Sequence, residues 1–188
     1  QNLVRANVQA LKTYSSARDE YQANGDKMVF LDANENPFEN GLNRYPDPQQ
    51  RDLKAVLAKL KNVKQEQILL GNGSDEVLDL LFRAFCEPGI DKVITLPPTY
   101  GMYKVLAQIN NIENREVLLT EEFQLDVKSI LKSADKQTKL LFICSPNNPT
   151  GNAFDAREIK AILENFRGIV VIDEAYIDFC DFASISFL

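Results

Sequence analysis

Four short polar segments of the sequence contain the residue types that bind small ligands. They are residues 71–76, 97–103, 145–151 and 173–176. Each follows a run of apolar residues typical of a strand, and in parallel sheets ligands bind just beyond the carboxyl ends of the strands. We therefore expect the four segments to lie together at one edge of a sheet and to contact one ligand.

Residues 71–76 (Gly-Asn-Gly-Ser-Asp-Glu) place two glycines before a predicted helix start. Backbone N–H groups at such a start can bind a phosphate, which the helix dipole also favours. The segment is not a dinucleotide fingerprint, because Glu76 occupies the third glycine position, and it lacks the Gly-Lys-Ser/Thr of a P-loop. Taken alone, it is more typical of an ordinary turn in which Ser74 caps the helix.

Two further segments offer an aromatic ring and amide groups. Tyr100 follows a predicted strand and has a flat face on which a planar ring can stack, although a single tyrosine here is more often a packing residue. Asn147 and Asn148 lie in a compact turn that can direct an amide donor into a cleft. Every residue of that turn also suits a purely structural role.

Asp173 directly follows an apolar run. A carboxylate at the end of a buried strand costs free energy unless a cation pairs with it. That cation is either an arginine or lysine of the protein or the protonated ring nitrogen of a cofactor. Together, an anion site, a stacking ring, an amide donor and a carboxylate suit a phosphorylated, planar, basic heteroaromatic molecule. Pyridoxal 5′-phosphate (PLP) is such a molecule, and an acidic partner keeps its ring nitrogen protonated.

Strands and helices alternate along the chain, which predicts an α/β fold with a mostly parallel sheet and helices on both faces. Two nearly continuous apolar runs, 139–144 and 168–172, are typical of strands buried on both faces. The other predicted strands are 92–96 and 115–119, and residues 67–70 are expected to form a short strand or an extended run. The predicted helices are 3–11, 48–61, 74–86, one that ends near residue 110, 127–132 and 155–166.

The composition excludes several classes of protein. The 188 residues carry 21 Lys and Arg against 27 Asp and Glu, a net charge of −6, which argues against a binder of nucleic acids or anionic membranes. The sequence has no histidine, so Ser-His-Asp and Cys-His catalysis are excluded, and no metal site is predicted. No apolar stretch approaches the ~20 residues of a membrane span. Three cysteines without Cys-x-x-Cys spacing fit reduced thiols in a cytoplasmic protein.

Six segments of the chain together resemble the histidinol-phosphate aminotransferases, a group of fold-type I PLP enzymes in the aspartate aminotransferase superfamily. They are residues 31–37, 43–46, 73–76, 98–103, 145–151 and 173–176. The resemblance covers essentially the whole chain and implies PLP-dependent transamination of histidinol phosphate with 2-oxoglutarate, in L-histidine biosynthesis. The alternatives are a related aminotransferase, an amino-acid-phosphate decarboxylase of the same subgroup, or a truncated fragment that binds without catalysing.

The resemblance implies how several residues hold the cofactor. The backbone N–H groups of Ser74 and Asp75 would bind the PLP phosphate, and Tyr100 would stack on the pyridine ring. Tyr45 would reach the PLP phosphate of a neighbouring subunit, which implies a homodimer whose active sites are shared.

Three more residues would act on the reacting part of the cofactor. Asn148 and Tyr176 would hydrogen-bond the phenolate oxygen O3′, and Asp173 would pair with the pyridinium nitrogen, so that Asp173 and Tyr176 are the expected catalytic residues. Tyr14 and Asn34 match positions that line the substrate pocket. The implied partners are small molecules (histidinol phosphate and glutamate or 2-oxoglutarate) and a second copy of the chain.

The resemblance also implies a division into an N-terminal arm, residues 1–40, and a PLP-binding large domain, residues 41–188. The Schiff-base lysine of the superfamily lies some tens of residues after the Asp-Glu-Ala-Tyr segment, whereas the last lysine here is Lys160, on a predicted exposed helix face. We therefore expect an incomplete large domain that stops before that lysine, without the C-terminal small domain. We expect the chain alone to be inactive.

Overall fold

The computed structural model describes residues 3–15, 29–31, 33–180 and 183–187. The chain divides into two compact units, one formed by Gln1–Ala10 with Gly71–Leu188 and the other by Leu11–Leu70. Much of the predicted arm, residues 16–28, lies outside the described residues. The predicted functional boundary at residue 40 stays a prediction.

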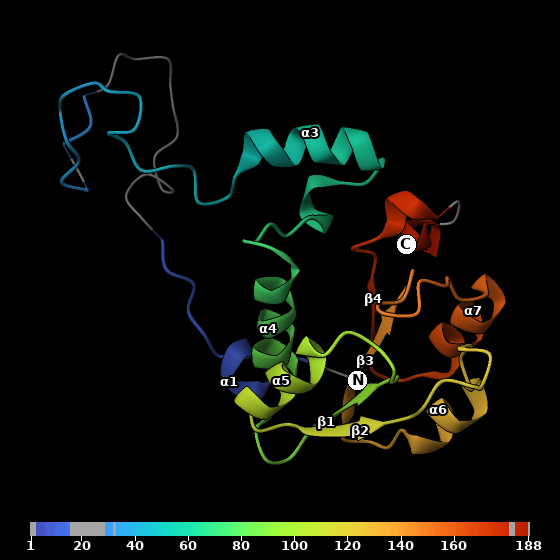
Figure 1. Cartoon of the computed structure of the whole chain (residues 1–188). Helices are drawn as coiled ribbons and strands as arrows, with labels where there is room; N and C mark the ends of the chain where they lie inside the picture. Colours follow the sequence, from blue (N-terminus) through green and yellow to red (C-terminus); the bar gives the residue numbers. More distant parts are fainter. Residues whose placement is uncertain (1–2, 16–28, 32, 181–182, 188) are drawn as a thin grey trace. The chain divides into compact units, whose positions relative to one another are not determined.

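The larger unit is built on a four-stranded sheet in which every pair of neighbouring strands is parallel (Figure 1). The strands are β1 (Lys92–Thr95), β2 (Glu113–Glu116), β3 (Thr138–Cys144) and β4 (Ile169–Asp173), in the order β2-β1-β3-β4. Because the strands are parallel, their carboxyl ends lie at one edge, where Cys144 pairs with Asp173. The predicted α/β fold with a parallel sheet is confirmed.

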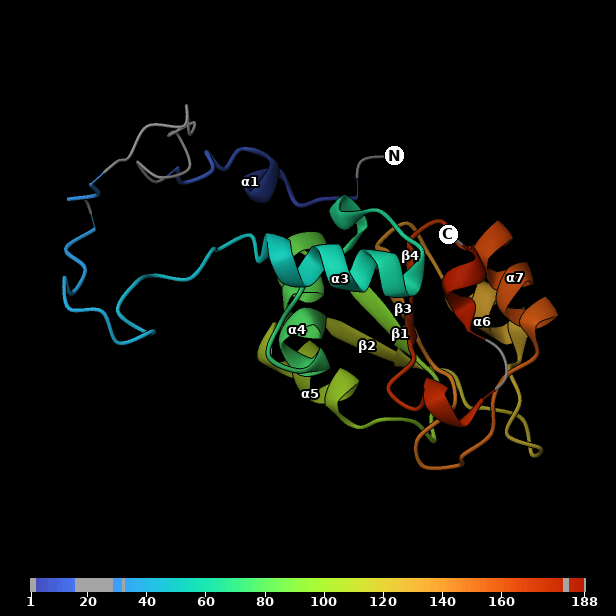
Figure 2. The same ribbon diagram turned by 90° about the horizontal axis from the view of Figure 1, so that it is seen from above.

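Helices cover both faces of this sheet, as predicted (Figure 2). One face packs against α4 (Ser74–Phe85) and α5 (Met102–Ile109), and the other against α6 (Val127–Ser133) and α7 (Ala156–Asn165). The alternation of side chains along β3 explains this, because Leu140, Phe142 and Cys144 join one core cluster and Leu141 and Ile143 the other.

Short helices complete the described structure. In the larger unit, α1 (Ala6–Gln9) is held by the ion pair of Arg5 with Glu87, whose Nε and Oε2 atoms lie 3.1 Å apart. Two 3₁₀ helices, η2 (Ile177–Phe179) and η3 (Ser184–Phe187), follow β4. The smaller unit contains α3 (Arg51–Lys61) and the 3₁₀ helix η1 (Gln65–Gln67). No described helix has both the length and the apolar character that a membrane crossing requires.

Three details differ from the prediction. Of the two forms expected for residues 67–70, the strand does not occur. Gln67 still belongs to η1, where its side chain accepts a hydrogen bond from the Lys64 N–H, and Ile68 after it is extended but lies outside the described sheet. The second strand is Glu113–Glu116 rather than 115–119, since its pairing ends where Thr95 ends β1. Strand β4 is only half-buried apart from Asp173, because it lies at the end of the described sheet and pairs on one side.

The three cysteines are free thiols with different environments. Cys86 and Cys144 are buried, and burial raises the pKa of the Cys86 thiol to about 12. At about pH 8 only about one Cys86 in 10⁴ is then a thiolate, the reactive form. We predict that a thiol reagent labels only Cys180 before the protein is unfolded in urea, and that Cys180→Ser removes the fast reaction. Rapid labelling of Cys86 in the folded protein would contradict the described core.

Gly168, just before β4, has no room for a side chain. A Cβ atom there would lie 2.5 Å from the backbone oxygen of Lys139 on the neighbouring strand. We predict that Gly168→Ala lowers the free energy of unfolding in urea by about 1–3 kcal/mol. The matched control is Gly101→Ala, because a Cβ at Gly101 would have no neighbour within 4 Å. Equal stability of the two variants would show that β3 and β4 do not pack as described.

Candidate active site

The polar segments that follow β1, β3 and β4 lie at the carboxyl edge of the sheet, together with the start of α4. The N–H of Ser145, directly after β3, donates to the carbonyl oxygen of Asp173 at the end of β4, 2.9 Å away. The Oδ1 atom of Asn147 accepts a hydrogen bond of 3.0 Å from the hydroxyl of Thr99. The same side chain donates to the backbone oxygen of Pro98 at 2.9 Å. Asn147, which is itself buried, therefore joins the segments after β1 and β3.

Asp173 is the buried carboxylate at this edge, with only 9% of its surface exposed. The Tyr103 hydroxyl donates to its Oδ2 atom at 2.7 Å, and the N–H of Ala175 donates to Oδ1 at 3.1 Å. No arginine or lysine among the described residues forms an ion pair with it. The sequence predicted that either an arginine or lysine of the protein or the ring nitrogen of a cofactor pairs with Asp173. The first of these is not found in the described part of the chain.

Tyr103 contacts the predicted site, although the sequence predicted no role for it. Its ring stacks on Phe142 with 4.8 Å between the centroids, and the Tyr100 ring meets it edge-on at 5.5 Å. Burial, with the neighbouring Asp173, raises the pKa of Tyr103 well above its ordinary value, so its hydroxyl remains a donor. The sequence feature that could have indicated a role for Tyr103 is its position three residues after Tyr100. Tyr103 lies on the face of α5 that packs onto the sheet.

Tyr100 proves to be both a packing residue and part of the polar edge. It is half-buried against the core cluster of α4 and α5, and its hydroxyl donates to the Asp75 carboxylate, with 3.2 Å to Oδ1. Burial, and then the neighbouring Asp75, raise the pKa of Tyr100. The structure thus links two predicted cofactor residues, Tyr100 and Asp75, and connects them through the Tyr103 ring to Asp173.

The start of α4 has the form of an anion site. Gly73 is the N-cap, with a positive φ of 78°, and no side chain caps the helix, so the predicted cap by Ser74 is wrong. Within the described part of the chain, the N–H groups of Ser74 and Asp75 have no hydrogen-bond acceptor, as is usual for a first helical turn. A Cβ at position 71 would lie 2.8 Å from Cγ2 of Val77, so a side chain there would require a neighbouring side chain to move.

Asn148 and Tyr176 lie on one hollow of about 250 Å³. Its lining residues are Pro146, Asn147, Asn148, Pro149, Gly151, Tyr176 and Phe179. The two residues predicted to contact the same oxygen of a ligand are therefore neighbours, although they are 28 positions apart in the sequence. Phe179 was not predicted from the sequence, because its position in the short 3₁₀ helix η2 has no periodic signal. The residue is 86% exposed.

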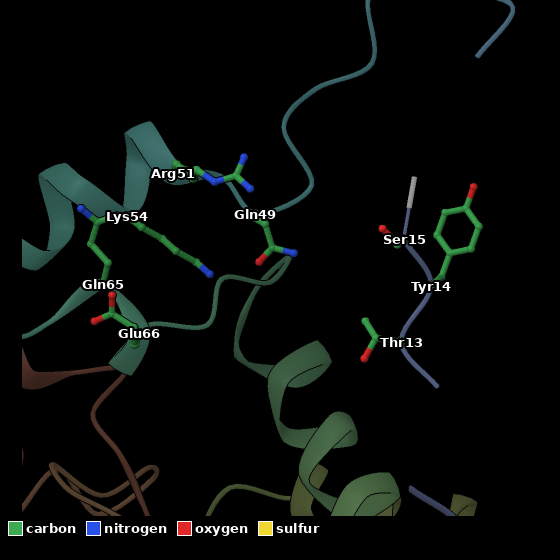
Figure 3. A pocket seen from close by; sticks show the side chains of 8 residues that line it. All are labelled: Thr13, Tyr14, Ser15, Gln49, Arg51, Lys54, Gln65 and Glu66. Atoms are coloured by element: carbon green, nitrogen blue, oxygen red, sulfur yellow. The ribbon is translucent and has the colours of Figure 1, made fainter. Parts of the chain in front are cut away.

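The other predicted residues belong to the smaller unit. Tyr14 lines a pocket of about 560 Å³ opposite Arg51 and Lys54 of α3 (Figure 3). Tyr45 exposes its ring, and its N–H donates to the Glu35 carboxylate at 2.8 Å. Asn34 precedes Glu35 and has a positive φ of 50°. The roles of Tyr14, Asn34 and Tyr45 stay predictions.

Comparison with known proteins agrees with this geometry. Residues 22–187 match the family described as aminotransferase class I and II. The chain is 68% identical over 179 residues to a histidinol-phosphate aminotransferase of Christiangramia forsetii, a match that covers 95% of this chain and 51% of that protein. It is 65% identical over 180 residues to a protein of the same name from Flavobacterium johnsoniae, with coverage of 95% and 52%. The chain spans about half the length of the curated relatives it matches.

A solved structure has the same fold. The histidinol-phosphate aminotransferase of Clostridium acetobutylicum superposes with a TM-score of 0.67 and 27% identity, over 78% of this chain and 43% of that one. The family match extends over all four segments at the carboxyl edge of the sheet. The chain therefore belongs to the aminotransferase class I and II family.

Proposed function

We propose that this chain forms the cofactor-binding part of a PLP-dependent aminotransferase that transfers an amino group between histidinol phosphate and 2-oxoglutarate, in histidine biosynthesis. The family and the names of the similar proteins support the reaction class. The single observation that carries the proposal is the buried Asp173 carboxylate, which hydrogen bonds hold in place but no described cation neutralises. When bound, PLP supplies a protonated ring that accepts the electrons released at the substrate carbon.

The hydrogen-bonding groups at the carboxyl edge of the sheet fit the ring nitrogen and the phosphate of PLP. Asp173 would hydrogen-bond the ring N–H and keep that nitrogen protonated, since a buried carboxylate is stabilised by a nearby cation. The free N–H groups of Ser74 and Asp75 would bind the phosphate, with the dipole of the 12-residue helix α4 adding to the attraction. The absence of a side chain at Gly71 leaves room for the side chains of Glu76 and Val77 in this turn.

The remaining contacts would orient the ring. Tyr100 would pack against one face of the pyridine, because its own hydroxyl and edge are already held by Asp75 and Tyr103. Asn148 and Tyr176, side by side on one hollow, would donate hydrogen bonds to O3′. Two hydrogen bonds donated to O3′ would stabilise the negative charge of this phenolate oxygen and so favour its deprotonated form.

The predicted residues of the smaller unit would contact the substrate and a second subunit. Tyr14 and Asn34 would contact the substrate, and Tyr45 would reach the cofactor phosphate of a second copy in a homodimer. The bond from the Tyr45 N–H to Glu35 supports a fixed backbone at that residue, since Glu35 also pairs with Arg44 at 3.0 Å. The cytoplasm, where histidine biosynthesis and reduced thiols are expected, is the proposed location.

The proposed pairing of Asp173 predicts the effect of removing its charge. Asp173→Asn should weaken PLP binding, measured by the change in PLP absorbance on titration, about tenfold to a hundredfold, the effect of losing one hydrogen bond to a charged group. The matched control is Asp178→Asn, which removes the same charge from an exposed residue of η2 and should leave the affinity unchanged. Equal affinity of Asp173→Asn and the unaltered chain would contradict the proposed site.

The lysines present predict the outcome of a trapping experiment. Lys160 lies on the exposed side of α7, where its side chain is 66% exposed and pairs with Glu164, so its predicted surface position is confirmed. No described lysine lines the hollow beside Asn148 and Tyr176. We predict that PLP followed by borohydride gives no stoichiometric adduct at a single lysine, and that Lys160→Arg changes nothing, as measured by mass spectrometry. A single-site adduct with sustained amino transfer would overturn this prediction.

A further inference from the structure

We propose that Tyr103 is the positioning residue that holds the Asp173 carboxylate in the plane needed to meet the ring nitrogen. This inference rests on the proposed function, since it assigns Tyr103 to the same cofactor site. The hydroxyl oxygen lies 2.7 Å from Oδ2, and both side chains are buried. Tyr103 would not touch the cofactor, and its effect would pass through the carboxylate.

A single carboxylate needs two fixed contacts to be oriented, because its plane otherwise turns about the Cβ–Cγ bond. Tyr103 holds one oxygen of Asp173, and the backbone N–H of Ala175 holds the other at 3.1 Å. Of these two donors, only the tyrosine is a side chain that a substitution can remove. Each oxygen retains a lone pair for a ligand, because a carboxylate offers about four acceptor sites.

The Tyr103 hydroxyl is itself rigidly placed. Its ring, fully buried, stacks on Phe142 at an interplanar angle of 14°, and Phe142 stacks on Phe82 with 5.3 Å between the centroids. Tyr100 forms a T-shaped contact with the Tyr103 ring, at an interplanar angle of 85°. The stack joins α4, β3 and α5, so the core of the larger unit determines where the hydroxyl points.

The electrostatic surroundings favour a neutral donor here. Burial, followed by the bond to Asp173, raises the pKa of Tyr103, and burial also raises the pKa of Cys144, so both groups stay protonated at neutral pH. Two titratable groups face this pair from the neighbouring elements: Cys144 faces both side chains, and Tyr100 faces Asp173. Asp75 and Tyr176 face Tyr100 in turn. A protonated tyrosine binds the carboxylate without adding the negative charge that would repel it.

The test compares Tyr103→Phe with the unaltered 188-residue chain. Phenylalanine keeps the ring stack and removes only the hydroxyl. The absorbance of bound PLP is followed from neutral to alkaline pH, and the midpoint of its change reports the loss of the ring-nitrogen proton. We expect Tyr103→Phe to lower this midpoint by about half a unit to one unit, and to weaken PLP binding about threefold to tenfold, because a mobile carboxylate stabilises the ring cation less.

The matched control is Thr138→Val, which removes a buried, hydrogen-bonded hydroxyl at the opposite end of β3. It should lower the unfolding midpoint in urea without moving the absorbance midpoint. In an Asp173→Asn background, Tyr103→Phe should cause no further shift, since it acts only through the carboxylate. Two results would overturn the positioning role. In one, Tyr103→Phe lowers stability but leaves the absorbance midpoint unchanged. In the other, Tyr103→Phe shifts that midpoint as much in the Asp173→Asn background as in the unaltered chain. Failure of the unaltered chain to bind PLP would instead contradict the proposed function, and this inference with it.

Discussion

A buried carboxylate that lacks a cation of its own is the constraint on which the candidate site depends. Asp173 ends β4 inside the edge of the sheet, and the fold stabilises it with two hydrogen-bond donors rather than a positive charge. Such a group is costly to bury, and a ligand that brings a positive charge offsets that cost. The arrangement therefore favours a basic ring over a neutral one. The fold itself positions Asp173 and its two hydrogen-bond donors, so this preference does not depend on a bound ligand.

The rest of the larger unit brings the complementary groups to that carboxylate. Parallel pairing of β3 with β4 places the Ser145 segment beside Asp173, and Asn147 connects it to the segment after β1. On one face of the sheet, the aromatic stack through Phe142 positions the Tyr103 hydroxyl. The first turn of α4 lies at the same edge, and its N–H groups at Ser74 and Asp75 have no acceptor among the described residues. One packed core thus supports the groups that would bind a phosphate, accept a hydrogen bond from a ring nitrogen and stack on a planar ring in the proposed site.

Long periodic elements and polar segments at strand ends were predictable from the sequence, because apolar spacing determines which face is buried. The parallel sheet, its two helical layers and the position of Asp173 follow from those signals. Tyr103 was missed because a tyrosine on a buried helix face has the pattern of an ordinary core residue. The helix cap was predicted at Ser74 because Gly73, the actual N-cap, has no side chain that would indicate one. The half-burial of β4 depends on the position of this strand in the sheet, which the local sequence does not encode.

The proposed pairing of Asp173 with the ring nitrogen of PLP can be seen directly in a crystal structure of this chain soaked with PLP. We expect one Asp173 oxygen within about 2.7–2.9 Å of the ring nitrogen, with the phosphate at the first turn of α4. A structure in which PLP binds elsewhere, or in which an arginine or lysine occupies the Asp173 carboxylate, would contradict it.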